Sequence, residues 1–437
     1  MLARMLTESD LTVTTLGERR IRSPLPMSTV PGDGVGDFVD DAQRVLYSIS
    51  YRAGQERSDL AFEAAGPREH IFFDPSQTRA AIVTCGGLCP GINNIIRTLF
   101  FELTVNYGVS DVLGIRYGFH GLNPEVGKPP LHLTQQIVAD IHHQGGTILG
   151  TSRGAQDVAL MVDFLQQAQI DILFCVGGDG TQKGSHAIAL EVARRKLPIA
   201  IVGLPKTIDN DIRFCNRTFG FATAVAEADT VIDRAHTEAI GVLNGIGLVK
   251  LMGREAGFIA AAATIASGDV NFTLIPEVPV KLDGPDGLLA KLERRLEARA
   301  HAVIVVAEGA GQDLIPQHKE AYDASGNRLL GNIGTFLKQQ ITDHFASKKL
   351  PVQVRYFDPS YIIRSCPANT DDSLLCERLA RYAAHAAMAG KIDVLVGLLH
   401  DEFVHVPLSI SAGQKKCLSL EDEIWSSVLA ITAQDKW

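Results

Sequence analysis

Short apolar runs recur along most of this chain, and they limit its fold more than any other feature. Each run has four or five residues, is rich in aliphatic side chains, and ends near glycine or a polar cluster. Runs of this length and content are typical of strands buried on both faces of a sheet. The six runs are residues 80–83, 111–115, 172–176, 199–202, 246–249 and 302–306.

Segments with helical character separate these runs. They are residues 93–105, 184–195, 223–238 and 288–300, the last with a charged face. Strands that alternate with helices predict βαβ units, and hence an α/β fold with mostly parallel, doubly wound sheets. In such sheets ligands bind outside the carboxyl ends of the strands, so chemistry is expected there.

The composition limits the possible function classes. With 437 residues, of which 46% are apolar, the chain is long enough for two or three domains with sizeable cores. Its net charge of −9 argues against a nucleic-acid partner, so a phosphate site would be a local basic pocket. No apolar run approaches the roughly 18 residues that a membrane span needs, and we expect a soluble, cytoplasmic protein without a membrane partner.

Seven cysteines are scattered along the chain without the paired spacing of a metal site or a redox motif. Several of them lie within or directly after apolar runs. Scattered cysteines of this kind favour buried free thiols in a reducing compartment over disulfides or metal ligands.

The peptide 205–211 gathers ionic and hydroxyl side chains directly behind the run 199–202. Asp209 and Asp211 share a parity if the backbone is extended, so both would face one cleft. One carboxylate would then serve as a general base, and the other would support a metal or tune the first. Lys206 would neutralise charge that develops on a transferred phosphoryl group. The alternative is an Asx-rich turn whose side chains only cap backbone groups.

A glycine-rich peptide, 177–181, follows the run 172–176. Its glycines allow a phosphate chain to approach the backbone, Asp179 can hold magnesium directly or through water, and Thr181 can donate to an oxygen. The peptide is no Walker A loop, and it misses GxGxxG because Gly184 falls one residue late. A plain turn is the alternative.

Three more strand ends, together with the segment 358–364, carry groups that suit a phosphorylated ligand. Gly86 and Gly87 lead to a helix, whose N-terminal N–H groups favour anions. Arg254 and Arg364 offer guanidinium groups, whose forked geometry matches phosphate. Glu308 closes the run 302–306, where it can accept from sugar hydroxyls. Each group alone is a weak signal, but their repetition at strand ends predicts a site.

At these motifs the sequence resembles the 6-phosphofructokinases, most closely the ATP-using subgroup of plants and trypanosomatids. The resemblance covers residues 77 to about 410 and rests on GGLCPGINNIIR, GGDGTQKG, PKTIDNDI, GIGLVKLMGREAGFIA, EGAGQ and DPSYIIRS. It implies transfer of the γ-phosphoryl group of Mg·ATP to the 1-hydroxyl of fructose 6-phosphate, giving fructose 1,6-bisphosphate and ADP in glycolysis. It also implies a homo-oligomer, either a tetramer or a dimer.

The resemblance assigns roles to individual positions. Asp209 would be the base, with Lys206, Asp211 and Gly180 also at the catalytic centre, and Asp179 would bind Mg²⁺ together with the nucleotide. The implied nucleotide contacts are Gly86, Gly87, Arg153, Gly154, Gly178, Asp179, Gly180 and Thr181. The implied fructose 6-phosphate contacts are Thr207, Ile208, Asp209, Met252, Gly253, Arg254, Glu308, Arg355, Tyr361 and Arg364.

The family's fold implies two similar α/β lobes with the active site in the cleft between them. Residues 1–76 have mixed polarity and several turn residues, and they look like an N-terminal extension wrapped on a core. We expect a nucleotide and magnesium lobe from residues 77–219 plus about 364–415. A sugar-phosphate lobe would then comprise residues 220–363 plus about 416–437.

The phosphoryl donor depends on two positions, Gly180 and Lys206. Diphosphate-using relatives typically pair aspartate with lysine there, whereas the simple ATP enzymes have glycine at both. An aspartate at position 180 would place negative charge in the path of the nucleotide's α-phosphate, at a cost on the order of several kcal/mol. Gly180 therefore favours ATP, and a diphosphate-dependent enzyme is the alternative.

Two other function classes are possible, and the sequence departs from the simple bacterial enzymes at one position. NAD kinases also carry a GGDG turn but have no reason to carry the remaining motifs. A non-catalytic sensor of sugar phosphates or nucleotides would not need Asp209 beside the acceptor hydroxyl. Gly245 stands where simple bacterial enzymes carry an arginine that reaches a neighbouring subunit's substrate, and Lys250 is the candidate replacement.

Overall fold

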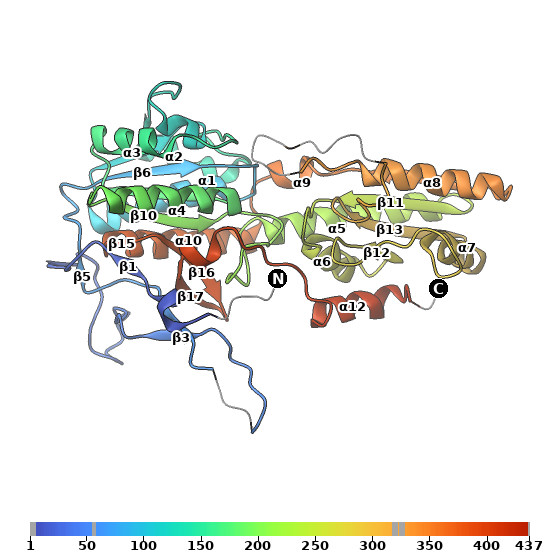
Figure 1. The fold of residues 1–437 in the computed structure, drawn as a ribbon, viewed down its shortest axis with the longest axis horizontal. Coiled ribbons are helices and arrows are strands. Elements are labelled where there is room, and N and C mark those ends of the chain that lie inside the picture. The colour runs from blue at the N-terminus through green and yellow to red at the C-terminus, as the bar shows by residue number, and fades with distance from the viewer. Residues whose placement is uncertain (1–5, 55–57, 317–321, 323–327, 436–437) are drawn as a thin grey trace. The chain divides into compact units, whose positions relative to one another are not determined.

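The chain folds into two compact units, each with its own sheet (Figure 1). The computed structural model describes residues 6–54, 58–316, 322 and 328–435. Unit 1 holds the described residues of Met1–Thr207, Ile212–Gly220 and Cys366–Lys415. Unit 2 holds those of Ile208–Asp211, Phe221–Ser365 and Lys416–Trp437. The peptide predicted to carry the chemistry is thus divided after Thr207.

A nine-stranded sheet forms the centre of unit 1. Its five central strands, from β16 to β7, are parallel, and the strands on both flanks are antiparallel. In sheet order the strands are β3 (Arg44–Leu46), β4 (Ala61–Ala64), β17 (Glu402–Pro407), β16 (Val394–Leu399), β10 (Ala200–Pro205), β9 (Ile172–Gly177), β6 (Arg79–Thr84), β7 (Asp111–Ile115) and β8 (Leu131–His132). Two small antiparallel sheets pair β1 (Thr14–Thr15) with β15 (Lys391–Ile392) and β2 (Ile21–Arg22) with β5 (His70–Ile71).

Helices cover the parallel strands of unit 1. Apolar side chains of α3 (Val158–Gln167) and α4 (Asp179–Arg194) share one buried cluster with β6, β7, β9 and β10. Helix α10 (Thr370–Met388) contacts β10 and β16, and α1 (Ile92–Phe101) packs on α10. Short helices complete the unit: α2 (Gln135–Val138), α11 (Leu408–Ser411), 3-10 turns at Glu8–Leu11, Gly118–Leu122 and Ile141–His143, and a π-helix at Glu102–Tyr107.

A four-stranded, fully parallel sheet forms the centre of unit 2. Its order is β12 (Phe272–Leu274), β13 (His301–Ala307), β11 (Gly245–Leu251) and β14 (Gln353–Phe357). Helices α7 (Leu288–Arg299) and α8 (Ile333–Ser347) share a buried apolar cluster with β11 and β13. Helix α5 (Phe221–Ile240) contacts β11, β13 and α6 (Phe258–Ser267), while α12 (Glu423–Thr432) packs on α6 and the short α9 (Ile362–Ser365) on α5.

The predicted α/β fold is confirmed, with parallel strands at the centre of both sheets. All six apolar runs form strands: β6, β7, β9, β10, β11 and β13. Two helix predictions were inaccurate at their ends. Helix α4 begins at Asp179 rather than at 184, because the glycine-rich peptide itself forms its first turn. The predicted helix 93–105 is α-helical only to Phe101 and continues as a π-helix.

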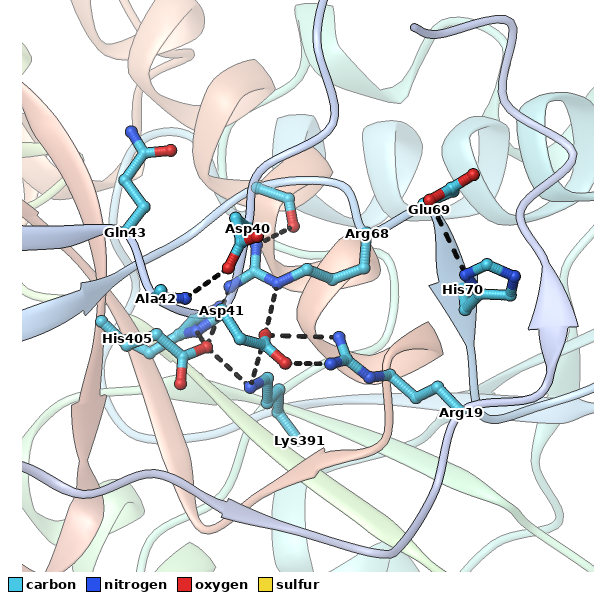
Figure 2. A network of polar contacts seen from close by, with 12 residues as sticks. Arg19, Asp40, Asp41, Ala42, Gln43, Arg68, Glu69, His70, Lys391 and His405 are labelled. Atoms are coloured by element: carbon cyan, nitrogen blue, oxygen red, sulfur yellow. Dashed lines mark hydrogen bonds and ion pairs between the residues drawn. The ribbon is translucent and has the colours of Figure 1, made fainter. Parts of the chain in front are cut away.

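The N-terminal segment is part of unit 1 rather than a layer wrapped on it, because β3 and β4 continue the nine-stranded sheet through β17. A buried polar network ties this segment to the core (Figure 2). Lys391 is only 2% exposed, and its Nζ lies 2.6 Å from Glu63 Oε1 and 3.3 Å from Asp41 Oδ1. Arg68 donates to the same two carboxylates at 2.8 and 2.9 Å. Charges that are buried must be paired in this way to be tolerated.

The seven cysteines are all free thiols, and five of them are buried, as predicted. The prediction of burial is wrong for Cys417, which is exposed, and Cys366 is half-buried. Burial raises the pKa of the Cys175 thiol to about 12, so this group is a neutral, packed side chain. In the described part of the chain, no helix is both long and apolar enough to cross a membrane.

Candidate active site

Three adjacent parallel strands of unit 1, β10, β9 and β6, bring their carboxyl ends to one edge of the sheet. Each strand is followed by one of the predicted site peptides: Lys206–Thr207 after β10, 178–181 after β9, and Gly86–Gly87 after β6. The sheet order therefore gathers three motifs that span residues 86 to 207 of the sequence. This edge is where an open α/β sheet binds ligands.

The peptide 178–181 turns directly from β9 into α4. Gly178 is the N-cap residue, and its carbonyl accepts the N–H groups of Thr181 and Gln182 at 2.9 and 3.0 Å. Gly180 is exposed, and a Cβ added there would meet no atom within 4 Å. The first turn of α4 thus presents backbone to open space, an arrangement that suits an anion such as a phosphate group.

Asp179 lies in the first turn of α4, and both of its carboxylate oxygens have partners. Its Oδ2 is 2.9 Å from Lys183 Nζ, one helical turn along, and its Oδ1 accepts the Gly413 N–H at 2.7 Å. Neither partner was expected from the sequence. The four-residue spacing of Asp179 and Lys183 is a signal that would have revealed the ion pair.

The Gly86 turn is held by the predicted segment 151–154. The Gly86 N–H donates to the Ser152 carbonyl at 3.1 Å, and the Thr151 hydroxyl donates to the Gly86 carbonyl at 2.6 Å. Gly86 has φ +84 and Gly154 has φ +102, a backbone region that favours glycine. The structure therefore brings the predicted Arg153-Gly154 segment next to Gly86, and Arg153 is exposed there.

Lys206 lies beneath the same turn. Its side chain is 5% exposed, and its Nζ donates to the Gly87 carbonyl at 2.6 Å. A Cβ added at Gly86 would lie 3.5 Å from that Nζ. The ammonium group is thus fixed against the backbone of Gly86 and Gly87, close to the residues predicted to meet the nucleotide.

The rest of the heptapeptide departs from the expected conformation. The Thr207 carbonyl accepts the Thr218 hydroxyl at 2.7 Å within unit 1. In unit 2, Asp209 is half-buried, and the Asp211 carbonyl accepts the Lys416 N–H at 2.8 Å. Asn210 has φ +54, so the extended backbone assumed for Asp209 and Asp211 is wrong. Asparagine tolerates this left-handed conformation better than most residues, which explains the break.

Unit 2 has its own edge of strand ends, formed by β13, β11 and β14. The Glu308 N–H donates to the Leu251 carbonyl at 2.9 Å, and the Gly309 N–H donates to the Gly253 carbonyl at 3.0 Å. Gly253 has φ +126, and a Cβ there would lie 2.6 Å from the Ala256 carbonyl oxygen. The predicted residues Met252, Gly253, Arg254 and Glu308 therefore lie side by side.

The segment after β14 adds an arginine and a tyrosine to this edge. The Arg364 guanidinium lies over the Tyr361 ring, 4.6 Å from its centroid, and Tyr361 is 75% exposed. Arg355 is different, because it lies within β14 opposite Gly247 and faces Glu238 of α5 at 3.6 Å. Within unit 2 the structure thus leaves Arg355 away from the loops that hold Arg254 and Glu308.

Lys250 and Asp358 form an ion pair near this edge, with 2.7 Å between Nζ and Oδ2. Burial raises the pKa of Asp358, but hydrogen bonds from Lys250 and Ser360 outweigh it, so this pKa lies below its ordinary value. Burial and the nearby Asp358 raise the pKa of Tyr356 to about 12. Lys250, the candidate replacement for the bacterial arginine, therefore already has a carboxylate partner.

Asp179 is the residue that the sequence predicts to bind Mg²⁺ together with the nucleotide. Among the described residues, no three histidine, cysteine, aspartate or glutamate side chains are grouped so as to hold a metal ion by themselves. Magnesium rarely needs such a cage, because one or two carboxylates, water and substrate phosphates complete its octahedron. A single carboxylate in the first turn of α4 is compatible with that pattern.

A family model described as phosphofructokinase matches residues 79–387. The chain belongs to the phosphofructokinase family. It is 45% identical to the ATP-dependent 6-phosphofructokinase of Borreliella burgdorferi, with 97% of each chain covered. It is 46% identical to the chloroplastic ATP-dependent 6-phosphofructokinase 4 of Arabidopsis thaliana, over 91% of this chain and 75% of that one.

The predicted subgroup is confirmed, since these relatives include plant enzymes and that of Trypanosoma cruzi, which is 40% identical over 98% of this chain and 88% of its own. A pyrophosphate-dependent phosphofructokinase from Marinobacter aquaeolei has the same fold, with a TM-score of 0.65 at 19% identity over 81% of this chain and 91% of that one. Phosphofructokinase from Pichia pastoris has a TM-score of 0.63 and 22% sequence identity, over 82% of this chain and 37% of that one. At such identities these two likenesses concern the fold alone. The family membership removes NAD kinase from the alternatives.

Proposed function

We propose that this chain is an ATP-dependent 6-phosphofructokinase, which transfers the γ-phosphoryl group of ATP to the 1-hydroxyl of fructose 6-phosphate. The observation that carries the proposal is the 45% identity with an ATP-dependent relative over 97% of both chains. The open surroundings of Gly180 support the same donor, because nothing there opposes a nucleotide phosphate. Intact Asp179 and Asp209 argue against a non-catalytic sensor.

In the proposed mechanism, unit 1 binds the donor and unit 2 the acceptor. The turns at Gly86 and 178–181, with Arg153, would hold the nucleotide phosphates, and Asp179 would hold Mg²⁺. The metal would neutralise charge on the transferred group, and Lys206 would add a second positive charge. Positioning and charge neutralisation supply most of the catalysis in phosphoryl transfer, because the protein has little covalent chemistry to perform.

The acceptor would be held by charged and aromatic side chains of unit 2. Arg254 and Arg364 suit the 6-phosphate, and Glu308 suits sugar hydroxyls. Asp209 would take the proton of the 1-hydroxyl as that oxygen attacks the γ-phosphorus. Arg355 stays a weaker candidate, since it lies within β14 and faces Glu238. A homo-oligomer and a cytoplasmic location also stay proposals, the second supported by the free thiols.

A donor-exchange assay tests the proposal. Purified protein is given fructose 6-phosphate and Mg²⁺ with either ATP or diphosphate, and fructose 1,6-bisphosphate is measured by a coupled reaction. We expect turnover with ATP and little with diphosphate. Turnover with diphosphate only would favour the alternative that Lys206 suggests, and tight ligand binding without product from either donor would favour a sensor.

A further inference from the structure

Gln182 lies in the first turn of α4, next to the residues proposed to meet the donor, and it has no assigned role. Its side chain is 1% exposed. Its Nε2 donates to two backbone carbonyls, those of Gly177 at 2.8 Å and Leu204 at 3.1 Å. Gly177 ends β9 and Leu204 lies next to the end of β10, so one amide group joins the ends of two neighbouring strands.

The neighbouring backbone is shaped around this amide. A Cβ added at Gly203 would lie 2.2 Å from Gln182 Oε1, so only glycine leaves room for the side chain over β10. The Gly177 carbonyl also accepts the Lys206 N–H at 3.1 Å. The same carbonyl therefore receives donors both from the residue after β10 and from Gln182. Glutamine suits the position because its NH₂ group offers two N–H donors for two carbonyls.

Stability alone is a poor explanation for this glutamine. Within the described part of the chain, its buried Oε1 has no hydrogen-bond partner. A buried acceptor without a donor opposes folding, and this cost offsets part of what the two hydrogen bonds from Nε2 contribute. A buried residue with an unpaired polar atom next to a binding site is expected to have a role in that site.

We propose that Gln182 is a positioning residue for the phosphoryl donor. By holding Gly177 and Leu204 together, it fixes the spacing between the turn 178–181, which begins one residue after Gly177, and Lys206, which lies two residues after Leu204. A change in that spacing would misplace donor phosphates relative to the Lys206 ammonium group. The acceptor residues Arg254, Glu308 and Arg364 belong to unit 2 and would not be disturbed. This inference rests on the proposed function.

The variant Gln182→Leu tests the proposal, because it removes both donors and keeps most of the volume. We expect the KM for ATP and the Kd for ADP to rise about tenfold, with the KM for fructose 6-phosphate changed less than about twofold. Ser185→Ala is the matched control: Ser185 is also buried in α4, but its hydroxyl bonds the Thr181 carbonyl within the helix. Its kinetics should stay close to those of the wild type.

A second variant, Gly203→Ala, displaces the same Gln182 amide by a change in β10. In Gly203→Ala the new methyl group would push Gln182 off its two carbonyls, so the same rise in the KM for ATP is expected. The double variant with Gln182→Leu should show little further rise in the KM for ATP, because both changes break the same two hydrogen bonds. A role in stability alone would lower the unfolding midpoint and leave both KM values unchanged, which would overturn the proposal. Wild-type turnover in the same assays tests the proposed function separately.

Discussion

Lys391 offers the sharpest test of how the N-terminal segment is joined to unit 1. Replacement by methionine keeps an unbranched side chain of similar length but removes the ammonium group that bonds Glu63 and Asp41. Lys391 and Arg68 are both almost fully buried, and Figure 2 shows both facing Asp41. The variant therefore leaves two carboxylates with one buried cation fewer.

The expected cost follows from that geometry. Removing one partner of a buried ion pair usually costs about 3–5 kcal/mol, because the other charge stays buried. Arg68 still bonds both carboxylates, and Asp41 is partly exposed, so the lower end, about 3 kcal/mol, is expected here. For a denaturant slope of about 3 kcal/mol/M, this lowers the urea midpoint by about 1 M.

Far-UV circular dichroism in urea measures this shift of the midpoint. Two further variants test whether the shift comes from the buried charges. Lys348→Met removes a more exposed lysine that pairs with Glu293, and we expect a cost below about 1 kcal/mol. Adding Glu63→Gln to Lys391→Met should recover part of the loss, because it removes the charge left behind. If Lys391→Met shifted the midpoint no more than Lys348→Met, the account of this network would be refuted.

Three further predictions concern the donor, the base and acid stability. Gly180→Asp should fold normally, since the position is open and an acidic side chain suits a helix N-terminus, but its kcat/KM for ATP should fall about 100-fold in the coupled assay. Asp209→Asn should lower kcat at least about 100-fold and leave the KM for fructose 6-phosphate within about twofold, whereas the exposed Asp283→Asn should change neither. Burial raises the pKa of Glu63, but bonds from His405 and Lys391 lower it to about 2, from 4.5. The lowered pKa contributes about 3 kcal/mol that is present above pH 4.5 and lost as the pH falls towards 2, so urea midpoints of Glu63→Gln should decline less steeply over that range.

The parallel strands were predictable because burial on both faces leaves a continuous apolar run in the sequence. β9 and β10 are entirely buried, and nothing polar interrupts their runs. The glycine-rich site peptides were predictable for a related reason, since glycine favours the positive φ seen at Gly86 and Gly253 and leaves room for the close approach at Gly253. In both cases the constraint acts on residues that are adjacent in the chain.

The features that were missed have three different causes. Lys391 is more than three hundred residues from Asp41, Glu63 and Arg68, so no local sequence pattern predicts their network. Gln182 was missed because its partners are backbone carbonyls, which every sequence has. The conformation at Asn210 was missed because the backbone was taken as extended, although asparagine often adopts the left-handed conformation seen there.

Lys206 and Gly180 were read together from the sequence as a clue to the donor, but the structure places them in different surroundings. Its Nζ bonds the Gly87 carbonyl, so the ammonium group contacts the turn after β6. The open space at Gly180 belongs to the first turn of α4, after β9. In the proposed mechanism this ammonium group faces a phosphate of either donor, so a lysine at position 206 does not by itself distinguish ATP from diphosphate. Under the proposed function, Gly180 is the position expected to distinguish ATP from diphosphate, so Gly180→Asp tests the donor more directly than a change at Lys206.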